Sequence, residues 1–243
     1  MFALQQQFDI LKEEILRDKS SAVEGDWDSL FSDAALLRAI KAAEHRFARR
    51  TLLLVRNDYE VQTAESVADY ELPVHIIAVA ALRRADKTYV QRTGGSLLGL
   101  TDARTSYTAA ESWAVAGDSD PVAFATDELS VADTGVAVTL TVYPAPAAAY
   151  VQLYTARVVV VPDYEYTKSD MKRNSIIPEL YQFGVLCGAA AQLLKTDDRD
   201  AGDFRKAGAF EGEFEKVVRE AQQHRILSMA LSAGFDHSAS PFK

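Results

Sequence analysis

Four histidines and a single cysteine are the residues that could supply general-base, metal-binding or nucleophilic chemistry in this chain. His45, His75, His224 and His237 are scattered, and none belongs to a HExxH or HxH pair. Without ligand spacing, they are better interpreted as solvated or partner-facing side chains than as metal ligands. Cys187 lies in the most apolar segment, where a cysteine usually behaves as a small buried hydrophobic residue rather than as a nucleophile.

Three further groups each allow a structural interpretation beside a functional one. Thr93-Gly94-Gly95-Ser96 is glycine-rich, but no Lys-Ser/Thr follows, so a loop is favoured over a phosphate cradle. An acidic cluster without EF-hand spacing favours helix capping over cation binding; it consists of Asp197, Asp198, Asp200 and Asp203. Three aromatic residues could line a sugar site, although aromatics in strands are more often core: Trp113, Tyr150 and Tyr154. We therefore expect no enzymatic activity, no metal and no cofactor.

The composition is that of a soluble globular protein, with 243 residues, 48% hydrophobic and 25% charged. The net charge is -9, and residues 58–162 alone hold 13 acidic and 6 basic groups, a net charge of -7. Such a surface repels phosphate backbones and disfavours sequence-specific nucleic-acid binding. The longest apolar run, Phe183–Leu194, is too short for a bilayer span, and the first 18 residues lack a signal-peptide pattern. We expect synthesis in the cytoplasm and no membrane contact.

Apolar residues at helical spacing predict four helices, two at each end of the chain. They cover Gln5–Asp18, the region from Ser32 to Arg50, Leu180–Leu194 and Asp200–Leu231. Ser32 or Asp33 can cap the second helix, whose end carries a basic cluster of Arg46, Arg49 and Arg50. That cluster is equally compatible with phosphate or acidic-partner contact and with a solvated helix end.

Between the second and third helices the pattern changes to β-branched and aromatic residues in short runs. The clearest strand is Val136–Tyr143, where valine and leucine alternate with alanine and threonine as on a sheet with one buried face. Further strands are expected at Ser66–Leu72, Ile76–Arg83, Ser112–Val115, Val122–Thr126 and Tyr150–Val161.

This order of elements predicts an α+β protein, a four-helix bundle with an inserted antiparallel β-rich domain. The expected parts are the N-terminal helices at 1–57, the β domain at 58–162, the C-terminal helices at 163–232 and a flexible, extended tail at 233–243.

Read in order, these elements resemble the head-to-tail adaptor (connector) proteins of tailed bacteriophages, in particular members with a β domain set into a helical bundle. The resemblance runs from about residue 30 to about residue 225 and depends on the order and spacing of its motifs. These motifs are Ser32–Ile40, Tyr70-Glu71-Leu72-Pro73, Val138–Tyr154 around Tyr143-Pro144-Ala145-Pro146, and Ile177-Pro178-Glu179-Leu180-Tyr181.

The resemblance implies a structural virion protein of the neck that assembles as a ring, usually dodecameric, beneath the portal protein. The ring would extend the DNA channel, let genomic DNA pass without sequence-specific binding, and dock a tail or nozzle protein. Portal contacts are expected at Phe235, Asp236, His237, Pro241, Phe242 and Lys243. Ring contacts are expected at Lys216, Arg219, Arg46, Arg49 and Arg50, and acidic residues facing the channel or the tail at Asp118, Asp120, Asp127 and Glu128.

Two other interpretations stay open at this point. The β domain could recognise a carbohydrate or host receptor, with the helices serving as an oligomerisation stalk. A different neck or tail-completion protein of a phage would also fit the same elements.

Overall fold

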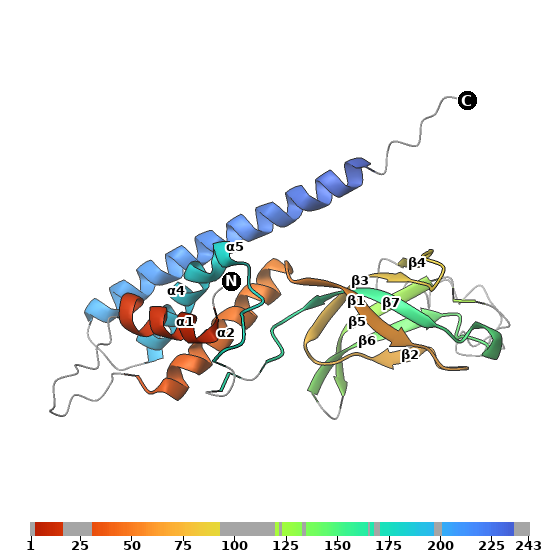
Figure 1. The fold of residues 1–243 in the computed structure, drawn as a ribbon, viewed down its shortest axis with the longest axis horizontal. Coiled ribbons are helices and arrows are strands. Elements are labelled where there is room, and N and C mark those ends of the chain that lie inside the picture. The colour runs from red at the N-terminus through yellow and green to blue at the C-terminus, as the bar shows by residue number, and fades with distance from the viewer. Residues whose placement is uncertain are drawn as a thin grey trace. The chain divides into compact units, whose positions relative to one another are not determined.

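Helices from both ends of the chain pack together, and the residues between them form a sheet (Figure 1). The structure is a computed structural model that describes residues 3–16, 31–92, 120–121, 123–132, 135–164, 166–167, 171–196 and 201–235. It divides into a helical unit, Met1–Leu54 with Pro162–Lys243, and a β unit, Val55–Val161. The predicted α+β class is confirmed.

The helical unit consists of short N-terminal helical turns followed by three longer helices. Its elements are α1 (Leu4–Asp9), the π-helix η1 (Ile10–Ile15), α2 (Asp33–Thr51), α4 (Glu179–Thr196) and α5 (Ala201–Phe235). Ser32 is the N-cap of α2, and its Oγ accepts a hydrogen bond from the Ala35 amide at 3.2 Å. Helix α2 ends at Leu52, which adopts the left-handed conformation with φ 50°.

Helices α4 and α5 form an antiparallel pair, and α4 also packs on α2. Gly184 and Gly188 let the backbones of the pair approach closely, because a Cβ at either position would overlap a side chain of α5. At Gly188 the added Cβ would lie 2.5 Å from Cδ2 of Phe214, a residue without solvent exposure. This close contact makes α4 the central, apolar helix of the unit.

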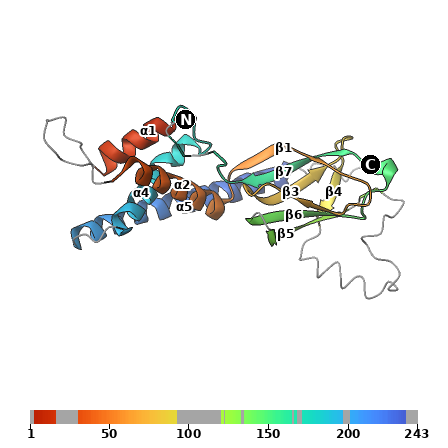
Figure 2. The ribbon, with the colours of Figure 1, turned by 90° about the horizontal axis from the view of Figure 1, so that it is seen from below.

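The β unit contains seven strands in the order β1-β7-β3-β4-β5-β6-β2. All of them except β2 are labelled in Figure 2. They are β1 (Val55–Gln62), β2 (Asp69–Glu71), β3 (Ile76–Arg83), β4 (Tyr89–Arg92), β5 (Ala123–Ala132), β6 (Gly135–Tyr143) and β7 (Leu153–Val160). All neighbouring strands are antiparallel except β4 and β5, which pair in parallel through Gln91–Ala123 and Arg92–Phe124. The expected antiparallel pairing is confirmed for the other neighbouring strands and is wrong only for β4 and β5. The connection from 93 to 122 is long enough for the chain to return in the same direction.

One apolar core joins both halves of the sheet, because strands β1, β3 and β7 share it with β5 and β6. On β6 the side chains of Val138, Leu140 and Val142 are buried, as the alternation in the sequence predicts. Tyr154 belongs to this core and is fully buried, whereas Tyr150 lies in the short 3-10 helix η2 (Ala148–Tyr150) and is 39% exposed. Trp113 and the strand expected at Ser112–Val115 lie outside the described residues.

The last helix is longer than the sequence pattern predicts. Helix α5 continues to Phe235, so the expectation of an extended tail from Ala233 is wrong for its first three residues. The apolar periodicity fades near Leu231, but no proline lies between Ala201 and Pro241 to block further helical hydrogen bonds. Residues 236–243 lie outside the described residues.

Candidate interaction surfaces

A buried carboxylate connects three segments of the helical unit. Glu44 of α2 has no solvent exposure and accepts hydrogen bonds from four side chains. Gln7 Nε2 of α1 and Ser175 Oγ donate to Oε1 at 3.0 and 2.6 Å, and the hydroxyls of Tyr164 and Tyr166 donate to Oε2. We call these five residues the Glu44 network. It anchors both α1 and the 162–178 segment to α2.

The basic end of α2 is attached to α5 by two arginines. Arg50 forms a bidentate ion pair with Glu215, in which Nη2 lies 2.8 Å from Oε2. Arg46 lies 3.1 Å from Glu211 Oε1, and its guanidinium stacks 3.9 Å from the centre of the Phe214 ring. Both arginines therefore help to hold the two helices together within one chain. Arg49, between them in sequence, is exposed.

A second basic feature lies along another face of α2. Arg38, Lys41, His45 and Arg49 follow one another at intervals of three or four residues, so they share one face of the helix. With Ala42 and Arg46 they line an open hollow of about 510 Å³, which we call the cationic hollow. Burial, followed by the charges of Lys41 and Arg49, lowers the pKa of His45 below its usual value. The spacing of Arg38, Lys41 and His45 was visible in the sequence, but the basic cluster was predicted only from Arg46 onward.

Large apolar side chains are exposed on α4 and α5. Leu180 is 69% exposed and Ile226 is 65% exposed, and Phe183 and Leu227 are also more than half exposed. Tyr181 and His224 pack with ring centres 6.0 Å apart, which places the first turn of α4 beside this part of α5. We call Leu180, Phe183, Ile226 and Leu227 the apolar end of the helical unit. Beyond it α5 continues past α4 (Figure 1).

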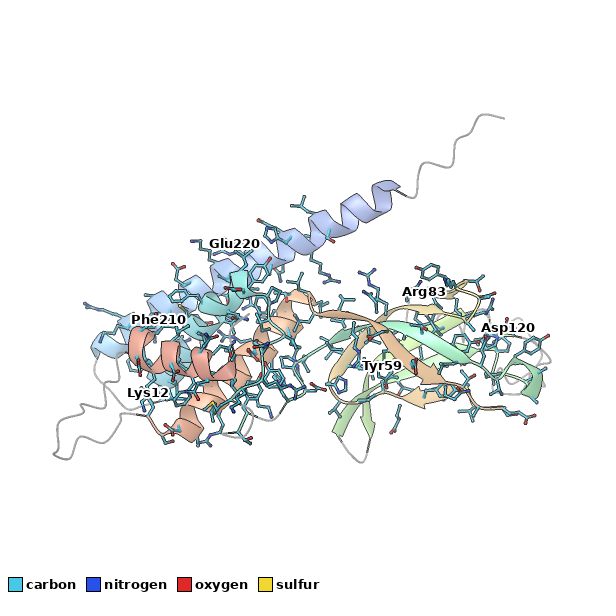
Figure 3. The ribbon with its side chains drawn as sticks, viewed as in Figure 1. Lys12, Tyr59, Arg83, Asp120, Phe210 and Glu220 are labelled. Atoms are coloured by element: carbon cyan, nitrogen blue, oxygen red, sulfur yellow. The ribbon has the colours of Figure 1, made fainter. Side chains whose placement is uncertain are left out.

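The remaining predicted contact residues are distributed over both units. Lys216 and Arg219 are exposed on α5, as is the nearby Glu220 (Figure 3). In the β unit, Asp120 forms an ion pair with Arg84 at 3.2 Å and accepts a hydrogen bond from Gln152 at 3.4 Å. The portal residues from Asp236 onward and Asp118 lie outside the described residues, as do the side chains of Phe235, Asp127 and Glu128.

The residues with potential for catalysis are not assembled into a site within the described part of the chain. His224 Nδ1 is hydrogen-bonded to the hydroxyl of Tyr181, and Cys187 is buried in α4, where burial raises the pKa of its thiol to about 11. Among the described residues, no three side chains of the types that bind metals come together. No described helix is both long enough and apolar enough to cross a bilayer.

A family comparison connects this architecture to known proteins. The family model described as SU10 adaptor protein matches residues 8–234, which include both units. No curated protein matches the chain in sequence. The match confirms the resemblance to phage head-to-tail adaptors that the order of motifs predicts. The chain, with its exposed helical surfaces and its β unit inserted between α2 and α4, belongs to the SU10 adaptor protein family.

Proposed function

We propose that this phage adaptor forms a homo-oligomeric ring below the portal protein in the virion neck. In this proposal the helical unit, packed as a four-helix bundle, forms the body of the ring, which extends the DNA channel and docks tail or nozzle proteins. The family membership supports a structural adaptor role in general. The ring and its position are our inference.

The observation that carries the proposal is the apolar end of the helical unit. A monomer that worked alone would leave Leu180, Phe183, Ile226 and Leu227 in water, each more than half exposed. Clusters of exposed large apolar side chains commonly mark protein interfaces. The described residues of this chain do not cover these four side chains, so a neighbouring subunit or the portal is the natural partner.

The C-terminal residues are the proposed portal contact. They are Phe235, Asp236, His237, Pro241, Phe242 and Lys243. Deleting residues 236–243 removes all of these residues except Phe235 and leaves the described end of α5 in place. We expect the truncated chain to fold normally and to bind the portal more weakly; unchanged portal binding would refute this part of the proposal.

The ring is tested by negative-stain electron microscopy of the purified chain, alone and mixed with the portal protein of the same genome. We expect a symmetric additional layer on the narrow end of the portal. Bare portal rings at micromolar adaptor concentration would refute the proposal and leave the β unit as a ligand- or receptor-binding module to be tested with glycans.

Two variants examine which helical surface forms the ring. Ile226→Ser with Leu227→Ser removes apolar area from the apolar end, and Lys216→Glu with Arg219→Glu reverses charge on α5. We expect both to reduce ring formation while far-UV circular dichroism stays unchanged. Val74→Ser is the matched control, because Val74 is 58% exposed but lies in the β unit. Normal rings from both double variants would exclude these parts of α5 from the interface.

A further inference from the structure

The cationic hollow on α2 has the composition of an anion site. Its floor consists of the half-buried residues Ala42, His45 and Arg46, and its rim consists of the exposed residues Arg38, Lys41 and Arg49. Four permanently cationic side chains thus surround one open hollow in a chain whose net charge is -9. Concentrating like charges on one helix face is unfavourable unless an anion occupies the space between them.

Among the described residues, one carboxylate reaches this group: Glu211 Oε1 lies 3.1 Å from Nη2 of Arg46. Among the same residues, the three exposed cations of the rim have no such partner. Lys41 and Arg49 form no ion pair with any described residue. Within the described part of the chain, Arg38 donates only to a backbone oxygen of its own helix, that of Ala34, at 3.2 Å. At the floor, Arg46 Nε is buried and has no hydrogen-bond partner among the described residues. A buried N–H group normally has a partner, so Nε of Arg46 and the three exposed cations of the rim can still take an acceptor.

We propose that the cationic hollow binds carboxylate side chains from the β unit of a second copy of this chain. This inference rests on the proposed ring, in which each subunit presents one surface to the next. The planar guanidinium group of arginine can donate two parallel hydrogen bonds to one carboxylate. The ammonium group of Lys41 on the rim adds a further positive charge.

Charge complementarity favours this occupant. Residues 58–162, which make up most of the β unit, hold 13 acidic and 6 basic groups. Most exposed carboxylates among the described residues of the β unit lie on its outer strands and their connection. They are Asp58 and Glu60 of β1, Glu65, and Asp69 and Glu71 of β2; Asp58 also pairs with Arg56, and Asp86 lies between β3 and β4. A DNA duplex is the less favourable occupant, because the same acidic groups and the net charge of -9 repel phosphate.

The direct test is a zero-length carbodiimide crosslink, which joins a lysine amine to a carboxylate only when they are in contact. Isotope-labelled and unlabelled chains are mixed, assembled on the portal and crosslinked, and mass spectrometry then separates crosslinks between copies from those within one chain. We expect Lys41 of one copy to be joined to a β-unit carboxylate of another. Assembled rings in which Lys41 is joined only within its own chain, or to nothing, would overturn the inference while leaving the ring intact.

Charge reversal provides the second readout. Lys41→Glu with Arg49→Glu is expected to weaken ring assembly by about tenfold or more, as for truncated interfacial ion pairs. Adding Glu60→Lys and Glu71→Lys to the same chain should restore part of the assembly. Lys172→Glu is the matched control, because Lys172 is an exposed lysine of the helical unit outside the hollow.

Three results of this experiment would count against the inference. If the reversed variant assembles like the wild type, the hollow is not an interface. If the charge-reversed variant assembles normally but the wild type binds short DNA duplexes through Lys41 and Arg49, the ligand of the hollow is phosphate. If the wild-type chain forms no layer on the portal, the proposed ring is refuted and this inference with it. If the wild-type chain forms the layer and the charge-reversed variant forms it equally well, this inference alone is overturned.

Discussion

Replacing Glu44 is the most direct test of how the helical unit is held together. In Glu44→Ala, three buried donors and one half-buried donor lose their acceptor at once. The buried donors are the side chains of Gln7, Tyr164 and Ser175, and the half-buried donor is Tyr166. An unsatisfied buried donor costs about 1 to 3 kcal/mol, and such costs within one network are not additive. We therefore expect Glu44→Ala to lower the free energy of unfolding by about 4 kcal/mol.

Glu44→Gln separates the carboxylate charge from side-chain volume. The amide keeps one acceptor oxygen but places an NH2 group towards two of the donors, so two charge-assisted hydrogen bonds are weakened. At about 1 kcal/mol each, the expected loss is about 2 kcal/mol. Urea unfolding followed by far-UV circular dichroism gives both values by linear extrapolation. Glu220→Gln is the control, because Glu220 is exposed on α5.

Hydrogen exchange tests the connecting role of the same network. The amides of Leu4 and Gln5 donate to backbone oxygens of Arg173 and Met171, so α1 and the 162–178 segment are also attached to each other. If Glu44 anchors both segments, Glu44→Gln should speed exchange at these two amides more than in α4. A change in unfolding free energy below about 0.5 kcal/mol together with unchanged exchange would refute the reasoning, because it would mean that the donors are satisfied without the carboxylate.

Three further outcomes follow from the described contacts. Burial, and after it the neighbouring carboxylate of Glu44, raises the pKa of Tyr166 above its usual value of 10.0, so the folded state keeps the proton that the unfolded state loses. The contribution of Tyr166 to the free energy of unfolding should thus be fully present below about pH 10 and should be lost as the pH rises further. In Tyr166→Phe the free energy of unfolding should fall less steeply with pH, which urea unfolding at a series of pH values would reveal. Gly188→Ala should destabilise the chain by about 1 to 3 kcal/mol, because the added Cβ overlaps Phe214. Gly208→Ala should stabilise the chain by about 1 kcal/mol, because the added Cβ meets nothing within 4 Å and alanine favours the helix. Thermal or urea unfolding measures both changes. Cys187 should resist thiol reagents at pH 8 until the chain unfolds, because burial raises its pKa to about 11; rapid labelling of the native chain would contradict its placement.

The local patterns in the sequence were sufficient to predict most of the helices and strands. The cap at Ser32, the strand Ile76–Arg83 and the buried alternation of β6 depend on residues a few positions apart, and the structure confirms them. Helical periodicity and strand alternation report which face of a local element is buried, so they can be identified without knowledge of the partner. Gly184 and Gly188 are four residues apart and therefore share one face of α4, and this is the face that packs closely on α5.

Pairing between distant segments was decided only by the tertiary structure. The parallel contact of β4 with β5, the ion pair between Arg50 and Glu215 and the hydrogen bond between Ser175 and Glu44 join residues far apart in sequence. In the sequence Glu44 is one glutamate in a helix rich in charged residues, and nothing marks it as buried. Its environment depends on which chain segments fold over α2, and local periodicity carries no information about that choice. Most helices and strands and the overall charge of this adaptor could therefore be predicted from the sequence alone. The strands β1 and β4, the polar network and the exposed surfaces became visible only when distant segments packed together.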